Sequence, residues 1–307
     1  MTKNIFITGG LGQDGQILIN ILKKRKINLT IFSKTKKSTT LGGVEFIKEN
    51  LLNKRRLDSI FIKKKPDIVL HLASNNPSFD EANYKIFFKE NFIATKNIFN
   101  STFEANQNAK FIFCSSSQIF KKKSGVVTEK SQNIITTDYT DFRIKSDNMM
   151  LKYKKQKKIN YTNAILFNHD SKYRNKKFLL PRVIISIIKK DIIFLKKIMK
   201  LNIFSDFSHA EDICNGLYKL MFSKINNDKL ILSSRKNTSV NKIIAHVIKK
   251  NNLKIDTIFN QKIIKKGLIG NNHLSKKLLK WKHKKNVFIA ATEIYKHYLK
   301  KMPGKTN

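Results

Sequence analysis

Residues 4–24 read NIFITGGLGQDGQILINILKK, and this stretch decides the fold. The run at 4–8 is short, apolar and rich in β-branched and aromatic residues, which is typical of a buried strand. A glycine-rich turn follows at once, and the residues after it have the apolar spacing of a helix. The stretch therefore predicts a strand, a glycine turn and a helix, in that order.

Gly9, Gly12 and Gly15 stand in the spacing G-x-x-G-x-x-G directly after the predicted strand. A dinucleotide pyrophosphate needs backbone N–H groups at a helix start with no side chain in the way, and glycine meets both needs. A tight turn with incidental glycines is the alternative. The strand before the turn and the pattern after it favour a cofactor site.

The same alternation continues along the chain. We predict strands at 28–33, 44–47, 67–74, 110–117 and 161–168, and helices at 53–64, 91–103 and 139–157. Alternating strands and helices predict an α/β fold, in which helices cover both faces of a parallel sheet. Beyond residue 169 we expect helices at 178–190 and 209–222, a polar turn near Asp206, a strand at 229–234 and a mostly helical tail from Thr238.

The chain is strongly basic. Its 307 residues include 62 Lys and Arg against 21 Asp and Glu, a formal net charge of +41. Such a charge suggests nucleic acid, an anionic membrane surface or another acidic partner. The cations run from Lys3 to Lys305 among many Ile and Asn residues, as an A- and T-biased coding sequence would give. Because no zinc-finger, RNP or basic-zipper pattern occurs, compositional bias is favoured and nucleic-acid binding is the minority reading.

The thiols and the apolar runs indicate a compartment. Cys114 and Cys214 are the two cysteines, far apart in sequence, and the opening MTKNIFITGG lacks the pattern of a signal peptide. Lysine interrupts even RVIISIIKKDIIFL, so no run approaches the roughly 18 apolar residues of a membrane span. We expect a cytoplasmic protein with no membrane span, and no residue pattern indicates a metal site.

The end of the second predicted strand indicates which dinucleotide is bound. An acid there binds the ribose 2′-hydroxyl of NAD, whereas a cation binds the 2′-phosphate of NADP. Ser33 stands where the acid would be, with Lys34, Lys36 and Lys37 close behind. NADP is therefore favoured over NAD.

Four segments together resemble the extended short-chain dehydrogenase/reductase family, also called the NAD-dependent epimerase/dehydratase family. They are TGGLGQDG at 8–15, PDIVLHLAS at 66–74, NFIATKNI at 91–98 and CSSSQIF at 114–120. Members of this family modify nucleotide-activated sugars. The resemblance covers nearly the whole chain.

Within that family, the chain most resembles GDP-mannose 4,6-dehydratases. The GQDG of the glycine turn, ILFNHDSKYRNKKF at 165–178, DFSHAEDI at 206–213 and LIGNNHLSKKLLKW at 268–281 carry this likeness, in the right order. It implies a Rossmann-type sheet domain, NADP, a GDP-linked sugar and a homodimer.

The resemblance also implies a domain division and a set of site residues. The Rossmann domain is expected at 1–168 and 207–234, and the smaller, mostly helical sugar-nucleotide domain at 169–206 and 235–307. The expected cofactor-binding residues are Gly9, Gly12, Gln13, Asp14, Gly15, Ser33, Lys34, Asn50, Leu51, Leu72, Ala73 and Ser74. The expected substrate-binding residues are Asn168 and Arg182, and the expected catalytic residues are Ser116, Gln118, Tyr139 and Arg143.

The catalytic pair departs from the family pattern. Counting back from LFNHD by the family's interval reaches Tyr139, so Arg143 replaces the lysine and Lys145 lies two positions too late. That lysine holds the nicotinamide ribose and favours the ionised tyrosine. Arginine keeps the charge and the donors, but its planar head is larger, so the exchange is not conservative.

Two further departures concern the reaction. Gln118 stands where the family has a glutamate that removes a proton from sugar carbon 5, and a neutral amide is no general base. Ser205 stands where the subfamily has a substrate-binding arginine. Three readings stay open: a dehydratase, a 4-keto reductase or epimerase, and a cofactor-binding protein without turnover.

Overall fold

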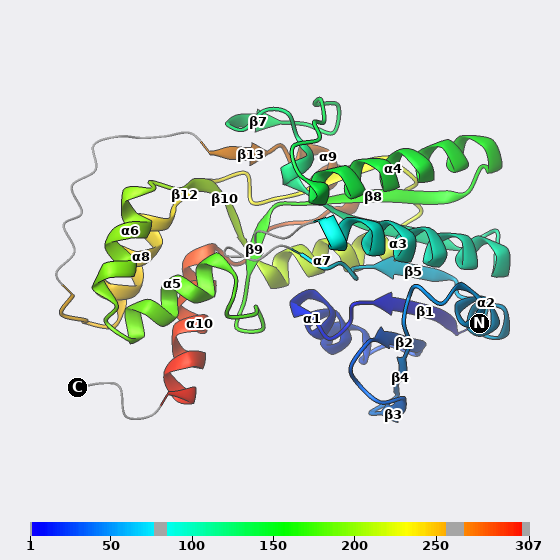
Figure 1. Ribbon diagram of the computed structural model, residues 1–307, viewed down its shortest axis with the longest axis horizontal. Coiled ribbons are helices and arrows are strands. Elements are labelled where there is room, and N and C mark those ends of the chain that lie inside the picture. The colour runs from blue at the N-terminus through cyan, green and yellow to red at the C-terminus, as the bar shows by residue number, and fades with distance from the viewer. Residues whose placement is uncertain (1, 77–84, 256–266, 303–307) are drawn as a thin grey trace.

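The computed structural model describes residues 2–76, 85–255 and 267–302, and the side chains of 85–89 are not described. Its main feature is an eight-stranded sheet in the order β11-β8-β6-β5-β1-β2-β4-β3 (Figure 1). The strands are β1 (Lys3–Thr8), β2 (Ile27–Ser33), β3 (Thr39–Leu41), β4 (Val44–Lys48), β5 (Ile68–His71), β6 (Lys110–Ser116), β8 (Asn160–Leu166) and β11 (Lys229–Leu232). Every neighbouring pair is parallel except β3 and β4, which confirms the predicted parallel sheet.

The strand order places the candidate site. From β1 the chain continues to β2 on one side, and β5 later pairs with β1 on the other side. The connections therefore diverge at the carboxyl ends of β1 and β5, where α/β sheets of this Rossmann type bind ligands. The glycine turn begins at this point, directly after Thr8.

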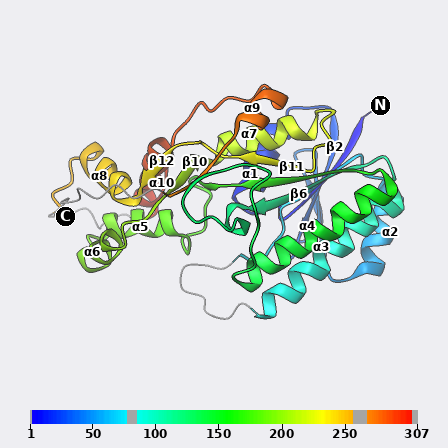
Figure 2. The same cartoon turned by 90° about the horizontal axis from the view of Figure 1, so that it is seen from above.

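Helices cover both faces of the sheet (Figure 2). One face carries α1 (Gln13–Leu22), α7 (Ala210–Met221) and α9 (His273–Leu279), and the other carries α2 (Lys54–Lys64), α3 (Lys85–Ala105) and α4 (Asp138–Lys157). Side chains alternate along a strand, so Ile5 and Ile7 pack with α1 while Phe6 packs edge-on against Phe61 of α2. The apolar strand β1 therefore contributes side chains to the hydrophobic cores on both faces of the sheet.

Four helices gather away from the large sheet, at the left of Figure 1, around a core of their own. They are α5 (Leu179–Ile188), α6 (Ile192–Lys200), α8 (Val240–Lys250) and α10 (Val287–Lys301). Leu279 and Trp281, expected in this second unit, instead pack in the core beneath α1 and α7. The proposed domain division remains a prediction.

Short strands connect the two parts. β9 (Asn168–Asp170), β10 (Phe204–His209) and β12 (Asn237–Ser239) form one small sheet, and β7 (Gly125–Val127) pairs with β13 (Leu268–Gly270). The predicted polar turn near Asp206 is wrong, because Asp206 lies within β10. Its buried carboxylate accepts hydrogen bonds from the backbone N–H groups of Ser234, Arg235 and Gly270, which allows a polar residue inside a strand.

Several lysines bind main-chain oxygens. Lys110 is 5% exposed, and its ammonium donates to the carbonyls of Ser223 and Ile225, both at 2.9 Å. Burial, helped by the charge of Lys3, lowers the pKa of Lys110 to about 8. Lys154 likewise donates to two carbonyls, those of Tyr161 and Asn226. Part of the basic composition therefore has a structural role.

Among the described helices, none is long and apolar enough to cross a membrane.

Candidate active site

The glycine turn leaves open space at the start of α1. Gly9 has φ +69°, and a Cβ there would lie 2.8 Å from the nitrogen of Ala73. A Cβ on Gly12 would meet only the carbonyl oxygen of Gly9, at 3.2 Å. Gly9 is therefore required by the backbone itself, whereas Gly12 keeps room for a ligand at the helix N-terminus.

A first cavity, of about 220 Å³, extends from the glycine turn to the ends of β2 and β4. Eight predicted cofactor residues line it: Gly9, Gly12, Ser33, Lys34, Asn50, Leu51, Ala73 and Ser74. The Ser33 hydroxyl accepts from the backbone N–H groups of Thr35 and Lys36, both at 3.2 Å, and so shapes the turn that carries Lys34. Glu49 also lines this cavity and was not predicted, although it directly precedes Asn50.

A second cavity, of about 190 Å³, brings together all four predicted catalytic residues. Ser116 comes from the end of β6, Gln118 from the 3₁₀ turn Ser117–Ile119, and Tyr139 and Arg143 from the first turns of α4. The start of α4 is set by a capping box, in which Thr137 and Thr140 satisfy each other's backbone N–H groups. Segments far apart in sequence thus meet in one place.

Arg143 is 5% exposed and lines the second cavity. One terminal nitrogen donates to the carbonyl of Cys114, and the other donates to Oδ1 of Asn76 at 3.2 Å. The guanidinium carbon lies 4.8 Å from the ring centroid of Tyr139. Among the described residues, Nε of Arg143 and Oγ of Ser115 are buried and have no hydrogen-bond partner.

Asp14 and His169 form an ion pair beside the second cavity. Nε2 of His169 lies 3.0 Å from Oδ2 of Asp14, and Nδ1 lies 2.6 Å from the carbonyl oxygen of Phe167. Burial lowers the pKa of His169, but the charge of Asp14 outweighs burial, so the pKa is raised. Burial likewise raises the pKa of Asp14, but His169 outweighs it and the pKa is lowered. Both nitrogens of the imidazolium are then donors.

Gln13 ties the same two segments together. Its amide nitrogen donates to the carbonyl oxygen of His169, and its amide oxygen accepts from the hydroxyl of Ser171. The GQDG turn and the NHDS segment are therefore in direct contact. Sequence reasoning selected Gln13 and Asp14 but missed His169, although it lies inside the quoted motif at 165–178.

A third cavity, of about 690 Å³, adjoins the glycine turn and the loop after β5. The predicted residues Gly9, Gly12, Gln13, Asp14, Gly15, Leu72, Ala73 and Ser74 line it. Arg174 and Lys177 line it as well, and neither was predicted. The guanidinium of Arg174 stacks on Phe178 at 3.7 Å and lies 3.6 Å from a carboxylate oxygen of Asp170. Two cations thus share a cavity with the helix N-terminus.

The two predicted substrate residues have different surroundings. Asn168 lines the second cavity, and its amide donates to the Ser205 hydroxyl at 2.7 Å. Arg182 lies on α5, with its guanidinium 4.8 Å from the ring centroid of Phe194, and it lines none of the three cavities. A substrate role for Arg182 remains a prediction.

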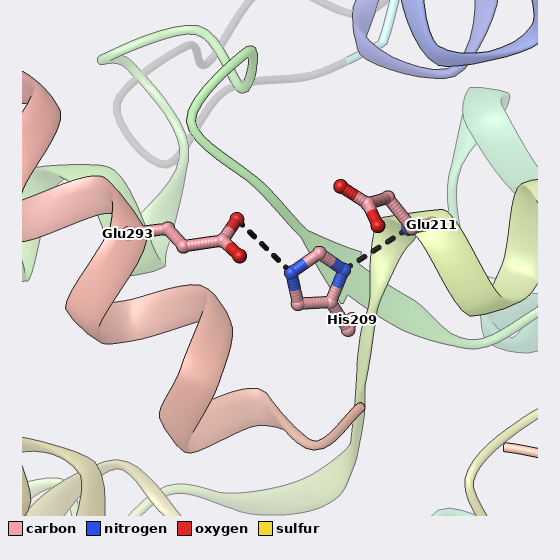
Figure 3. A group of neighbouring side chains, drawn as sticks. All are labelled: His209, Glu211 and Glu293. Carbon is pink, nitrogen blue, oxygen red and sulfur yellow. Dashed lines mark hydrogen bonds and ion pairs between the residues drawn. The ribbon is translucent and has the colours of Figure 1, made fainter. Parts of the chain in front are cut away.

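His209, Glu211 and Glu293 form a cluster of the kind that binds metal ions (Figure 3). However, Nδ1 of His209 accepts from the Glu211 backbone N–H at the start of α7, so Nε2 carries the proton and donates to Glu293 at 3.2 Å. The ammonium of Lys285 lies 2.7 Å from Glu211 and 3.3 Å from Glu293. Lys285 therefore already balances the charge of the two carboxylates in this cluster.

Both cysteines are buried and free. Burial, the largest influence, raises the pKa of the Cys114 thiol and the pKa of the Cys214 thiol. Although Cys114 lines the second cavity, its thiol is a poor nucleophile.

The sequence profile of the family described as GDP-mannose 4,6 dehydratase matches residues 6–297. The chain belongs to this family. A curated relative, the GDP-6-deoxy-D-talose 4-dehydrogenase of Aggregatibacter actinomycetemcomitans, is 26% identical over 238 residues, which is 74% of this chain and 72% of that protein. The family is one of nucleotide-sugar dehydratases and epimerases, as the resemblance predicted.

Solved structures share the fold over nearly the whole chain. RMD from Pseudomonas aeruginosa, complexed with NADPH, superposes with a TM-score of 0.78 at 13% identity, covering 98% of this chain and 99% of that one. UDP-glucuronic acid 4-epimerase from Bacillus cereus, in complex with NAD, superposes with a TM-score of 0.81 at 18% identity, covering 97% and 99%. The Rossmann-type architecture of the family is therefore confirmed.

Proposed function

We propose that this protein is an NADP-dependent enzyme that transfers hydride at carbon 4 of a GDP-linked sugar, as a 4-keto reductase or epimerase without dehydration. One observation supports the proposal that this enzyme does not dehydrate its substrate. Among the described residues that line the second cavity, Asp14 is the one carboxylate, and His169 holds it in an ion pair. Gln118 is a neutral amide, so no lining carboxylate is placed to remove the carbon 5 proton.

The roles follow from the lining side chains. When bound, the nicotinamide cofactor supplies or accepts the hydride at carbon 4. In the reductive direction Tyr139 gives its phenolic proton to the carbon 4 oxygen, and the Ser116 hydroxyl donates a hydrogen bond to that oxygen. Hydride plus proton convert the ketone to an alcohol. Arg143 provides the positive charge beside the Tyr139 ring, with its guanidinium carbon 4.8 Å from the ring centroid.

The choice of NADP rests on the first cavity. The residues there fit a dinucleotide, because Gly12 keeps the helix start clear and Lys34 supplies a cation at the end of β2. The solved neighbours include one complexed with NADPH and one in complex with NAD, so both cofactors occur in this fold. Ser33 in place of an acid supports NADP.

The assignment of a GDP-linked sugar rests on a relative's name and on the position of one residue. The curated relative from Aggregatibacter is named for oxidation at carbon 4 of a GDP-sugar. Asn168, at the position that holds the sugar nucleotide in the resembling dehydratases, lies at the rim of the second cavity. A homodimer is part of the same proposal, and light scattering on the purified protein tests it.

Dehydration is the second candidate, because the family profile that matches the chain is described by that reaction. Purified protein is incubated with NADP or NADPH and a panel of GDP-, dTDP-, CDP- and UDP-sugars that includes 4-keto forms. Nicotinamide absorbance and product mass are followed. We expect NADPH oxidation with a GDP-4-keto sugar and no loss of water.

One control variant and three outcomes test the proposal. Tyr139→Phe should bind NADPH as the unchanged protein does and lose turnover. Absence of any cofactor binding overturns the proposed function. Binding without turnover of any sugar favours a cofactor-binding protein, and a product lighter by one water favours the dehydratase.

A further inference from the structure

Asn76 ends the described part of the loop after β5 and lines both the second and the third cavity. Its Oδ1 accepts the hydrogen bond from a terminal nitrogen of Arg143 at 3.2 Å. The other terminal nitrogen donates to the Cys114 carbonyl at the end of β6. The guanidinium thus bridges the loop after β5 and the end of β6, and these are its two hydrogen-bond acceptors among the described residues.

The backbone just before Asn76 is held from α3. Oδ1 of Asn91 accepts from the Asn75 N–H at 2.8 Å, and its Nδ2 donates to the Asn75 carbonyl at 3.0 Å. One side chain therefore satisfies both backbone groups of Asn75, as a neighbouring strand would. The position of Asn76 is set by this clamp.

His71 extends the clamp to the glycine turn. Oγ of Thr95 donates to the Asn91 carbonyl, so it accepts from Nε2 of His71, and Nδ1 of His71 accepts from the hydroxyl of Thr8. That hydroxyl in turn accepts from the N–H of Ala73. In this series of hydrogen bonds each donor and acceptor is assigned in one consistent way. The loop from Ala73 to Asn76 is therefore held at both ends.

Arg143 is the cation that Asn76 contacts. Burial, followed by the charge of Arg143, lowers the pKa of His71 to about 3, so His71 is neutral. Two hydrogen bonds hold the planar guanidinium, and its carbon lies 4.8 Å from the centroid of the Tyr139 ring. A lysine ammonium lacks this planar head, so it cannot reproduce the same combination of two hydrogen bonds and ring contact.

We propose that Asn76 is a positioning residue that fixes the guanidinium of Arg143 against Tyr139, and that this contact lets arginine act as the cationic partner in hydride transfer at carbon 4. The inference rests on the proposed function. According to this proposal, arginine at position 143 depends on Asn76, the asparagine in the loop after β5.

The test compares the two partners in one cycle. Asn76→Ala should lower kcat about tenfold, since it removes a hydrogen bond to a charged group, and should leave the KM for the sugar and the affinity for 2′,5′-ADP unchanged. The ligand 2′,5′-ADP carries only the adenosine half of NADP. Asn76→Asp should keep most of the turnover, because its carboxylate still accepts from the guanidinium.

The decisive variant is Asn76→Ala in the Arg143→Lys background. There the asparagine has no guanidinium to hold, so its removal should change kcat less than about twofold. Asn108→Ala, an exposed asparagine at the opposite end of the sheet, controls for the substitution itself. Urea unfolding of each variant shows whether a loss of turnover comes from a loss of folded protein.

The outcomes separate the two proposals. If the unchanged protein turns over a sugar nucleotide and Asn76→Ala matches it, this inference fails alone. An equal loss with Arg143 in place and in the Arg143→Lys background also overturns it, because Asn76 would then act on the cofactor directly. If the unchanged protein turns over none of the sugars, the proposed function and this catalytic role fall together.

Discussion

Nε2 of His169 lies 3.0 Å from a carboxylate oxygen of Asp14, and the two residues are 155 positions apart in sequence. Asp14 belongs to the glycine turn at the start of α1, whereas His169 lies in β9, at the passage into the second group of helices. The glycine turn and β9 are therefore joined by one ion pair.

This pair predicts a characteristic dependence of stability on pH. The pKa of His169 is raised, so its stabilisation is complete below its unfolded value of 6.5 and is lost as the pH rises through the folded value. The pKa of Asp14 is lowered, so its stabilisation is complete above 3.8 and is lost as the pH falls through the folded value. The pair is strongest between these two values.

Asp14→Asn should therefore lower the free energy of unfolding by about 2 kcal/mol near pH 5.5, and by clearly less near pH 9. Urea unfolding at the two pH values measures this difference. His169→Gln should show the same pH dependence. A difference that stays constant between the two pH values would mean that the pair is not ionic.

Gly12→Ala should weaken NADPH binding about tenfold or more with little change in the unfolding temperature, because its Cβ meets only the Gly9 oxygen and fills the phosphate position. Gly9→Ala should lower both binding and stability, since Gly9 has a positive φ and its Cβ would strike the Ala73 nitrogen. Fluorescence titration and thermal unfolding check both variants. Unchanged NADPH binding by Gly12→Ala would argue against a pyrophosphate at the turn.

Lys34→Ala should weaken NADP binding about tenfold and leave NAD binding unchanged, because the lysine at the end of β2 faces the first cavity. Lys37→Ala is the matched control, since Lys37 is exposed and does not line that cavity. Glu49→Gln should strengthen NADP binding, because it removes a negative charge that also lines the cavity. Calorimetric titration with both cofactors measures these effects, and tighter NAD binding by the unchanged protein would contradict the assignment.

Gln118→Glu should introduce dehydration. A carboxylate at this exposed position of the second cavity supplies the missing base for the carbon 5 proton, and general bases contribute about a hundredfold or more. Mass spectrometry of the product from a GDP-sugar with a carbon 6 hydroxyl would detect the loss of water. Gln132→Glu makes the same charge change at another exposed position. Hydride transfer without water loss in Gln118→Glu would show that more than the base is missing.

The large sheet and the helices on its faces were predictable, because apolar runs and helical spacing are local signals. The four residues predicted to be catalytic lie together in the second cavity, and their catalytic roles stay a prediction. The sequence indicated Tyr139 through its fixed interval to LFNHD. Asp206 was misread because polar residues in sequence indicate a turn, whereas its carboxylate binds backbone N–H groups from two distant segments.

The contacts that complete the site were not predictable in this way. His169 contacts Asp14 and Asn76 contacts Arg143, each on another element, and no local pattern reveals which distant side chains meet. Arg182 lies near Phe194 and lines none of the three cavities, so its substrate role, which the family resemblance implied, stays a prediction.

The lysines that bind carbonyls have a consequence for how this sequence can change. A mutational bias can introduce lysine at many surface positions without changing stability, and replacing such a lysine then also leaves stability unchanged. At Lys110 and Lys154 a replacement lowers stability, because each ammonium donates hydrogen bonds to two main-chain oxygens that would lose them. At these two positions, a substitution of lysine is therefore expected to be more costly than at an exposed lysine without such bonds.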